Sequence, residues 1–178
     1  LQQWSNFADV TFVKVDETSS QVGTLRFAFT DHKNYLGETD ALAAGWASKP
    51  GAIPSSGDVW INADDKDVIP VRGQDYLFKT YMHEIGHALG LDHPFEGVDQ
   101  LPSSHDFRNY TIMSYTNPEN HYFYDSDGDY NYLISSTPMV YDIAAVQHLY
   151  GAASHNTADT VYKYDPSKPV VEAIWDSD

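Results

Sequence analysis

Two segments near the start of the chain alternate apolar and polar residues, which is the pattern of a strand with one buried face. They are residues 10–15 (VTFVKV) and 24–30 (TLRFAFT). Residues 58–62 (DVWIN) resemble a third, short strand. The segment 31–57 between them is rich in Gly, Pro, Ser and Asp, so we expect a long surface loop there.

The spacing of apolar residues becomes helical over residues 76–89. One stripe of the expected helix holds the apolar side chains Leu77, Tyr81, Ile85, Ala88 and Leu89. Gly90 follows, and glycine is common just past the end of a helix. We predict a helix that begins near residue 76 and stops at this glycine.

A second helix is predicted after residue 136. Thr137 is a suitable N-cap, Pro138 fits the first turn, and Gly151 is the expected stop. The expected apolar face of this helix consists of Tyr141, Ala145, His148 and Leu149. Strands are also expected at 160–164 and 170–175, and residues 1–8 read as the end of a helix.

The order of these elements, with strands first and helices later, predicts an α+β fold. A length of 178 residues is enough for one domain with a sizeable core, so we expect a single domain over 1–178. Residues 91–136 are rich in Asn, Asp, Ser, Tyr and Pro. A loop-rich stretch of that length inside a domain is usually functional.

The chain is strongly acidic, with 10 basic against 26 acidic residues and a net charge of −16. Such a surface repels phosphate backbones, which argues against nucleic acid as a partner. Its apolar runs are too short for a membrane span, so no membrane segment is expected. The absence of Cys excludes disulfides and thiolate metal sites. We expect a monomer.

Residues 83–93 (HEIGHALGLDH) match the pattern H-E-x-x-H-x-x-G-x-x-H. On a helix His83 and His87 are one turn and about 6 Å of rise apart, so both imidazoles face one point. A continuing helix would carry His93 about 9 Å along the axis and roughly 240° around it. Gly90 can end the helix in a left-handed conformation and return His93 to the other two.

Three histidines predict a zinc site, and they leave one coordination position open, as in catalytic sites. Glu84 follows the first ligand and is positioned to act as general base towards a zinc-bound water. The alternative is coincidence. The five fixed letters are expected by chance in roughly three of 100,000 chains of this composition. The other five histidines lack such spacing and are expected at the surface or in packing.

With this motif the chain resembles the metzincins, and among them the serralysin family of bacterial secreted proteases. Pro94 follows the third histidine, as in serralysins. Residues 111–115 (TIMSY) resemble the family's Met-turn. Residues 138–151 resemble the helix that follows it, and 57–62 (GDVWIN) resemble the substrate-side edge strand.

The resemblance implies a metzincin-like catalytic domain. Its expected parts are a twisted, mostly parallel sheet with an antiparallel edge strand, an active-site helix, and a loop-rich C-terminal subdomain with a second helix. Serralysins also have a strand before the position of Leu1 and a calcium-binding β-roll after residues 174–178. Neither is seen in this sequence, so we expect a catalytic domain without them.

The resemblance also implies roles for single residues. Tyr115 would ligate zinc in the free enzyme and swing away to hydrogen-bond the transition state, because a phenol near zinc has a lowered pKa. Met113 would pack beneath the metal. A peptide would lie antiparallel along the presumed edge strand, on Val59, Trp60, Ile61 and Asn62.

Residues 125–131 (DSDGDYN) place acidic or amide side chains at alternate positions, outside the resemblance. The side chains that offer oxygens to calcium are those of Asp125, Asp127, Asp129 and Asn131. The order differs from an EF-hand loop, whose glycine lies later and which carries a bidentate Glu at position 12. A solvated acidic turn is therefore the alternative to a calcium site.

These observations together predict a zinc endopeptidase that hydrolyses peptide bonds in proteins or peptides, with zinc as its cofactor. The resemblance to the serralysins implies that it is secreted and extracellular. Two alternatives remain. One is a zinc-containing binding module that has lost activity, although an intact Glu84 argues against it. The other is an incomplete fragment of a larger enzyme, active only with the missing strand and β-roll.

Overall fold

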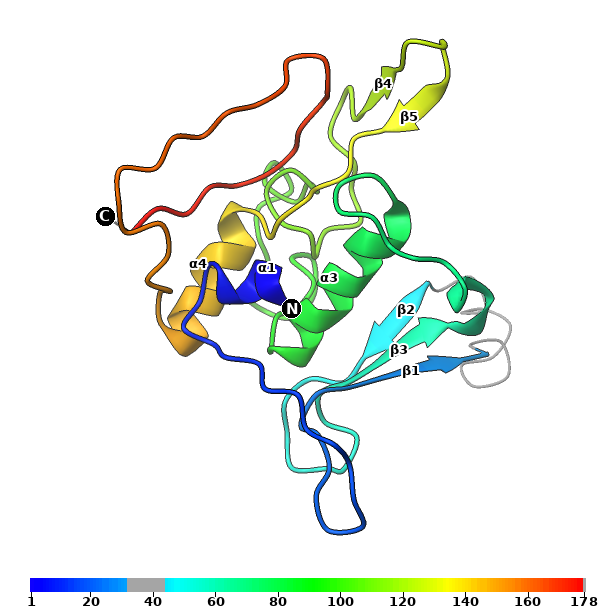
Figure 1. The fold of residues 1–178 in the computed structure, drawn as a ribbon, viewed down its shortest axis with the longest axis vertical. Helices are drawn as coiled ribbons and strands as arrows, with labels where there is room; N and C mark the ends of the chain where they lie inside the picture. The colour runs from blue at the N-terminus through cyan, green and yellow to red at the C-terminus, as the bar shows by residue number, and fades with distance from the viewer. Residues whose placement is uncertain (32–43, 178) are drawn as a thin grey trace.

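The computed structural model describes residues 1–31 and 44–177 (Figure 1). In chain order its elements are α1 (Gln2–Ser5), β1 (Arg26–Thr30), β2 (Gly45–Ala47), β3 (Asp58–Asn62), the 3-10 turn η2 (Ala63–Asp65), α3 (Tyr76–Ala88), β4 (Tyr122–Tyr124), β5 (Tyr130–Tyr132) and α4 (Val140–Tyr150). The fold is α+β, as the sequence predicts. In the described part of the chain no helix combines the length and the apolar character needed to cross a bilayer.

Three strands form a sheet in the order β1-β3-β2. β1 and β3 run parallel, with Arg26 opposite Asp58 and Thr30 opposite Asn62. β2 runs antiparallel to β3, with Trp46 opposite Trp60. β2 lies inside the segment 31–57 that was predicted to be loop. Residues 32–43 of that segment are outside the described residues.

An ion pair fixes the register of the parallel strands. Arg26 Nε and Nη2 donate to the two carboxylate oxygens of Asp58, at 2.7 and 2.6 Å. The carboxylate is buried, and bidentate charge-assisted hydrogen bonds are among the strongest in proteins. A slip by one residue would break this pair and turn Val59 and Ile61 away from the core. The pair and the apolar pattern therefore specify the same register.

α3 is the central element of the fold. Asp75 caps its start, because Asp75 Oδ1 accepts a hydrogen bond from the N–H of Phe78 at 2.7 Å. One side of the helix packs on the sheet through Leu77 and Ala88, which meet Val59 and Ile61. Fully burying a side chain such as that of Ile61 stabilises the fold by about 1.5–3 kcal/mol. The predicted helix is confirmed, but its apolar residues are divided between two clusters: Leu77, Tyr81 and Ala88 lie towards the sheet, and Ile85 and Leu89 belong to the other cluster.

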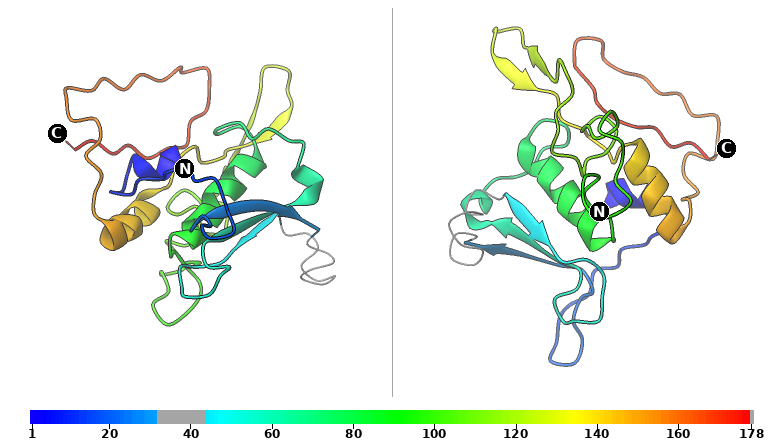
Figure 2. Two further views of the ribbon diagram at one scale, coloured as in Figure 1. Left: turned by 60° about the horizontal axis from the view of Figure 1, so that its bottom comes forward. Right: turned by 180° about the vertical axis from the view of Figure 1, so that it is seen from behind.

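The other side of α3 faces the C-terminal half of the chain. Figures 1 and 2 show α3 between the sheet on one side and α4 with α1 on the other. A second core cluster fills this space and includes the buried side chains of Trp4, Met82, Ile85, Ile112, Met113 and Val146. Both faces of α3 are therefore covered, which makes it a rigid base for side chains near its end.

α4 forms where a helix was predicted, but its start and its buried face differ from the prediction. It begins at Val140, and Thr137 does not cap it, because Thr137 Oγ1 accepts from the N–H of Ala173 at 2.8 Å. The buried residues of the helix are Asp142, Ile143 and Val146. The predicted apolar residues Ala145, His148 and Leu149 are exposed, and Tyr141 is only half-buried.

The physical reason is the buried carboxylate of Asp142. It accepts hydrogen bonds from the Met-turn and turns its own side of the helix inward, which a count of apolar residues cannot detect. The predicted stop is confirmed, since α4 ends at Tyr150 and Gly151 follows with a positive φ of 87°.

Three predicted strands are absent. Residues 10–15, 160–164 and 170–175 have no regular secondary structure and belong to no sheet in the described chain. A strand needs a neighbour to accept its hydrogen bonds, and residues 170–175 make only scattered ones, such as that from the N–H of Ser136 to Val171 O.

Conversely, the hairpin of β4 and β5 was predicted as loop. It projects from the body of the molecule in Figures 1 and 2.

Candidate active site

The structure brings the three motif histidines together. His83 and His87 lie one turn apart on α3, and their Nε2 atoms are 3.1 Å from each other. The Nε2 atom of His93 lies 3.2 Å from that of His83 and 3.1 Å from that of His87. No other group of three or more His, Asp or Glu side chains gathers this closely among the residues that the structure describes.

Gly90 brings His93 to this point. Its φ is 108°, a left-handed conformation that side-chain-bearing residues rarely adopt. The N–H of Leu91 donates to Gly86 O at 3.0 Å, and the N–H of Gly90 donates to His87 O at 2.9 Å. These two bonds form a Schellman motif, which ends α3 and reverses the chain. Gly90 thus ends the helix and returns His93 to the other two histidines, as the sequence predicted.

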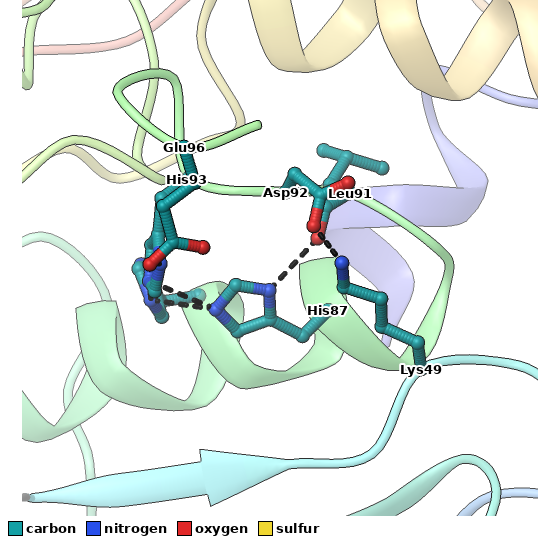
Figure 3. A network of polar contacts seen from close by, with 7 residues as sticks. Lys49, His87, Leu91, Asp92, His93 and Glu96 are labelled. Carbon is teal, nitrogen blue, oxygen red and sulfur yellow. Dashed lines mark hydrogen bonds and ion pairs between the residues drawn. The ribbon is translucent and has the colours of Figure 1, made fainter. Parts of the chain in front are cut away.

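The nitrogen triangle fits a zinc ion. Nitrogen ligands 2.0–2.1 Å from a tetrahedral zinc lie about 3.3 Å from one another, close to the separations found. His83 Nδ1 is 2.8 Å from Ile112 O, and His87 Nδ1 is 2.8 Å from Leu91 O. Donation from Nδ1–H to these carbonyls leaves each Nε2 lone pair free for a metal. Figure 3 shows the contact between His87 and Leu91.

Burial keeps the first two histidines neutral. It lowers the pKa of His83 to about 3 and that of His87 to about 4. A neutral imidazole is the form that binds metal. The Nδ1 atom of His93 lies 3.0 Å from a carboxylate oxygen of Glu96, outside hydrogen-bond alignment (Figure 3). Glu96 thus adds negative charge next to the triad.

Glu84 follows His83 on α3 and is buried, with 6% of its surface exposed. Burial raises its pKa to about 8, an effect that a bound dication would oppose. Its side chain lies against Gly45 of β2, where an added Cβ would be 2.8 Å from Glu84 Cγ and 2.9 Å from Thr80 Cγ2. Only glycine fits at this position without displacing Glu84. The sequence did not single out Gly45.

Tyr115 lies at the rim of the triad. Its ring centroid is 4.7 Å from that of His93 and 5.7 Å from that of His83, and 58% of the residue is exposed. Phe95 packs on the other side, at 5.2 Å. Burial, followed by the charge of Glu84, raises the pKa of Tyr115. The ring is therefore next to the histidines and still able to move.

Met113 packs beneath the metal-binding helix, as expected. It is 1% exposed, and an added Cβ on Gly86 of α3 would lie 2.8 Å from its sulfur. Asp142 holds this turn in place, with Oδ1 accepting from Thr111 Oγ1 at 2.5 Å and Oδ2 accepting from the N–H of Ile112 at 2.8 Å. Burial raises the pKa of Asp142 to about 6.

Arg108 is a second support that the sequence did not reveal. Its Nε donates to Ser114 O at 3.2 Å, and its backbone N–H donates to Thr116 O at 2.9 Å. Its Nη1 donates to Asn117 Oδ1 at 2.5 Å. These bonds hold the chain on both sides of Tyr115. Arg108 and Asp142 act across 6 to 31 residues of sequence, which no local motif signals.

The structure overturns the expectation that 58–62 is an edge strand. β3 lies between β1 and β2, so its backbone is hydrogen-bonded on both sides. Val59 and Ile61 are buried beneath α3, Trp60 faces Trp46, and Asn62 Oδ1 accepts from the N–H of Asp64 at 3.1 Å. These four residues cannot pair with a peptide. Among the described strands β2 is the terminal one next to β3, and it lies on the side of Glu84.

The expected calcium ligands lie at the turn between β4 and β5. Oδ1 of Asp125 accepts from the N–H groups of Asp127 and Asp129 at 3.1 and 2.9 Å. Its Oδ2 accepts from Asn131 Nδ2 at 2.8 Å. The oxygens of Asp125 are thus used by the turn itself, and the three carboxylates do not gather around one point. The structure adds no support for calcium here.

Two family models match the chain. One, described as matrixin, matches residues 1–101, and the other, described as Met-zincin, matches residues 74–164. They cover 101 and 91 of the 178 residues, more than half in each case. The second match contains the whole of the histidine motif and the Met-turn.

Several curated serralysins are similar to the chain over nearly all of its length. Serralysin B of Dickeya chrysanthemi is 33% identical, with 99% of this chain and 40% of the relative covered. Serralysin A of the same organism is 32% identical and is covered to 39%. Serralysin of Photorhabdus luminescens is 31% identical over 93% of this chain. The chain spans about 40% of the length of the Dickeya relatives. With the triad and the Met-turn in place, these matches show that the chain belongs to the matrixin family of metzincins and is serralysin-like.

Proposed function

We propose that the chain is the catalytic part of a zinc endopeptidase. The observation that carries this proposal is the triangle of three Nε2 atoms, 3.1–3.2 Å apart, with the buried Glu84 directly after His83 on the same helix. A structural zinc site would use four protein ligands, whereas the described residues offer three histidines here. The fourth position is left to water or substrate.

His83, His87 and His93 would hold the ion. Bound zinc would polarise the scissile carbonyl and lower the pKa of a water molecule at the site. Glu84 would take a proton from this water as the water oxygen attacks the carbonyl carbon. The same carboxyl group would then give the proton to the amide nitrogen as the C–N bond breaks. Burial strengthens the Glu84 carboxylate as a base, whereas a bound dication would favour its ionised form, which is the form that can accept the proton.

Tyr115 would stabilise the negative oxygen that forms during attack. Its hydroxyl is a hydrogen-bond donor, and its ring stands at the edge of the histidines with room to move. Donors aimed at a developing oxyanion typically contribute a rate factor of about 10²–10³. The Arg108 bonds on either side of Tyr115 would limit the motion to the side chain.

The substrate peptide would lie beside β2 rather than β3. Gly45 brings the backbone of β2 against Glu84, so a peptide next to this strand would present its carbonyl to the histidines. The substrates would be proteins or peptides, and the enzyme would work outside the cell, as the resemblance to the serralysin family implies. The second candidate, a zinc-containing binding module without activity, has no observation in its favour, since Glu84 is in place.

A peptidase assay tests the proposal. The protein is stripped of metal with a chelator, reloaded with zinc and incubated with fluorescent casein. We expect hydrolysis that disappears on stripping and returns with zinc. Zinc binding without hydrolysis would support the binding module instead.

A further inference from the structure

Lys79 is a buried cation on α3, four residues before His83 and therefore on the same face of the helix. Only 7% of it is exposed. Its Nζ lies 3.9 Å from the centroid of the Tyr76 ring. No carboxylate lies within ion-pair distance of this ammonium in the described part of the chain, and none of the described hydrogen bonds uses it.

Arg108 supplies a second positive charge to this place. Its Nε and Nη1 donate to Ser114 O and Asn117 Oδ1, and both acceptors are uncharged. The remaining N–H groups of the guanidinium have no acceptor among the described residues. Burial, and then the charge of Arg108, lowers the pKa of Lys79 to about 7.

This arrangement is unusual for so acidic a protein. With 26 acidic and 10 basic residues, partners for a cation are plentiful, and Arg26, Arg72 and Lys168 each have one. A buried charge without a counter-ion is costly, so such groups are normally paired. A buried lysine without a counter-ion, one turn before His83, therefore indicates a site for an anion that the chain itself does not supply and whose binding would favour the protonated amine.

The ammonium of Lys79 is within reach of an incoming ligand. In the described chain, the fully buried side-chain nitrogens and oxygens without a hydrogen bond are Trp4 Nε1, His93 Nδ1 and Asp176 Oδ1. Lys79 Nζ also has no hydrogen bond, yet it is not one of these fully buried atoms. Its tip is therefore accessible to solvent. The neighbouring ring of Tyr76 is 54% exposed.

We propose that Lys79 and Arg108 form an anion-binding subsite beside the histidine triad, which binds the carboxylate side chain of a substrate residue that flanks the scissile bond. The subsite rests on the proposed peptidase function. Its place follows from two links: Lys79 lies one turn from His83, and Arg108 holds the backbone around Tyr115. A peptide carbonyl at the histidines would set its adjoining side chain beside these cations. A bound carboxylate would complete the ion pair that the chain lacks.

Matched peptides test the subsite. Quenched fluorescent peptides with amidated C-termini carry Glu or Gln at each of the two residues that flank the cleaved bond. The wild type should prefer Glu over Gln at one of these positions by roughly tenfold or more in kcat/KM, from a charge-assisted hydrogen bond. Lys79→Met keeps the length of the side chain and should abolish this preference, mainly through KM. The readout is the ratio of kcat/KM for the Glu and Gln peptides within each variant, which should fall to about one in Lys79→Met.

Lys168→Met is the matched control, because Lys168 is an exposed lysine paired with Asp165. It should retain the preference. Equal rates for Glu and Gln peptides in the wild type at both positions would overturn the proposal. So would an equal loss on both peptides in Lys79→Met with an unchanged melting temperature. If that variant does not fold, Lys79→Gln replaces it, with the same expectation.

Binding separates this inference from the peptidase proposal. Affinities of the peptides for the zinc-loaded protein are measured by tryptophan fluorescence, whether or not they are cleaved. Tighter binding of the Glu peptide, lost in Lys79→Met, supports the subsite even if no hydrolysis occurs. Equal binding of both peptides to the wild type contradicts it. The Gln peptide is also tested with a free C-terminal carboxylate. If this carboxylate raised the affinity as much as the Glu side chain does, the assignment of the subsite to a side chain would be contradicted.

Discussion

The carbonyl oxygen of Ile112 is 2.8 Å from Nδ1 of His83, so the Met-turn directly orients the first histidine of the metal site. The N–H of the same residue donates to Oδ2 of Asp142 at 2.8 Å. A continuous path of hydrogen bonds thus runs from α4 through the turn to α3. The position of His83 Nε2 should depend on a carboxylate that never touches the metal.

Asp142→Ala tests this path. The change leaves the hydroxyl of Thr111 and the N–H groups of Ile112 and Met139 without an acceptor in a buried place. Each unsatisfied buried group costs about 1–3 kcal/mol, so we expect a loss of about 3 kcal/mol or more in unfolding free energy. Denaturant titration measures it, and competition with a chelator should show weaker zinc binding.

Asp142→Asn is the matched control. One amide oxygen can still accept from both N–H groups, so the loss should be clearly smaller than in Asp142→Ala. If both variants matched the wild type in stability and in zinc affinity, the path would have no energetic role.

Gly45→Ala tests the close approach of β2 to Glu84. The new Cβ would lie 2.8 Å from Glu84 Cγ, so the carboxylate must shift. We expect kcat to fall by about 10- to 100-fold with zinc content unchanged, because a displaced Glu84 carboxylate no longer has the geometry needed to accept the proton. Gly23→Ala is the control, since its nearest neighbour would be 3.4 Å away. A Gly45→Ala enzyme with native kcat would show that Glu84 tolerates the shift.

Much of the metal site was predictable because it is local. His83, Glu84 and His87 lie within two turns of one helix, and Gly90 alone explains the return to His93. Spacing and one conformational rule were enough to place these residues. The helix itself was predictable for the same reason, since its apolar stripe repeats within a short window.

The supports of the site were not predictable in this way. Gly45, Arg108 and Asp142 act on residues 6 to 39 positions away, and nothing nearby in the sequence indicates the partner. The order of the sheet was missed for a related reason. Residues 58–62 read as a strand, but whether a strand is central or terminal depends on the other strands. The hairpin of β4 and β5 was missed because its strands are only three residues long and lie in a segment rich in residues typical of turns.

Tyr115→Phe tests the role of the phenol. The three histidines are untouched, so zinc content should stay the same. If the hydroxyl stabilises the oxyanion, kcat should fall by roughly 10²-fold or more with little change in KM. With copper in place of zinc, any phenolate–metal absorption of the wild type should vanish. A Phe variant with native kcat would make Tyr115 a packing residue.

The metal-free protein should lose stability in mild acid because of its histidines. Burial lowers the pKa of His83 to about 3 and that of His87 to about 4, whereas unfolded histidine titrates near 6.5. Their contribution to stability is therefore complete above about pH 6.5. It is lost progressively as the pH falls towards 4, since only the unfolded chain takes up these protons.

The melting temperature of stripped protein at pH 7.5, 6.5 and 5.5 measures this loss. Glu84 and Asp142 have raised pKa values, so they stabilise the folded protein as the pH falls and oppose the effect of the histidines. The wild type is therefore compared with His83→Asn, which retains both carboxyl groups. The wild type should lose more of its melting temperature on acidification than the variant. Parallel curves would mean that His83 is not held neutral by burial.

Zinc titration of stripped protein, followed by the rate of peptide hydrolysis, tests the central claim most directly. The rate should rise in proportion to added zinc and level off at about one ion per chain, because His83, His87 and His93 form one site. Glu84→Gln should bind the same amount of zinc with activity lower by at least roughly 10²-fold. Hydrolysis that is unaffected by stripping, or a chain that binds no zinc with all three histidines intact, would contradict the account.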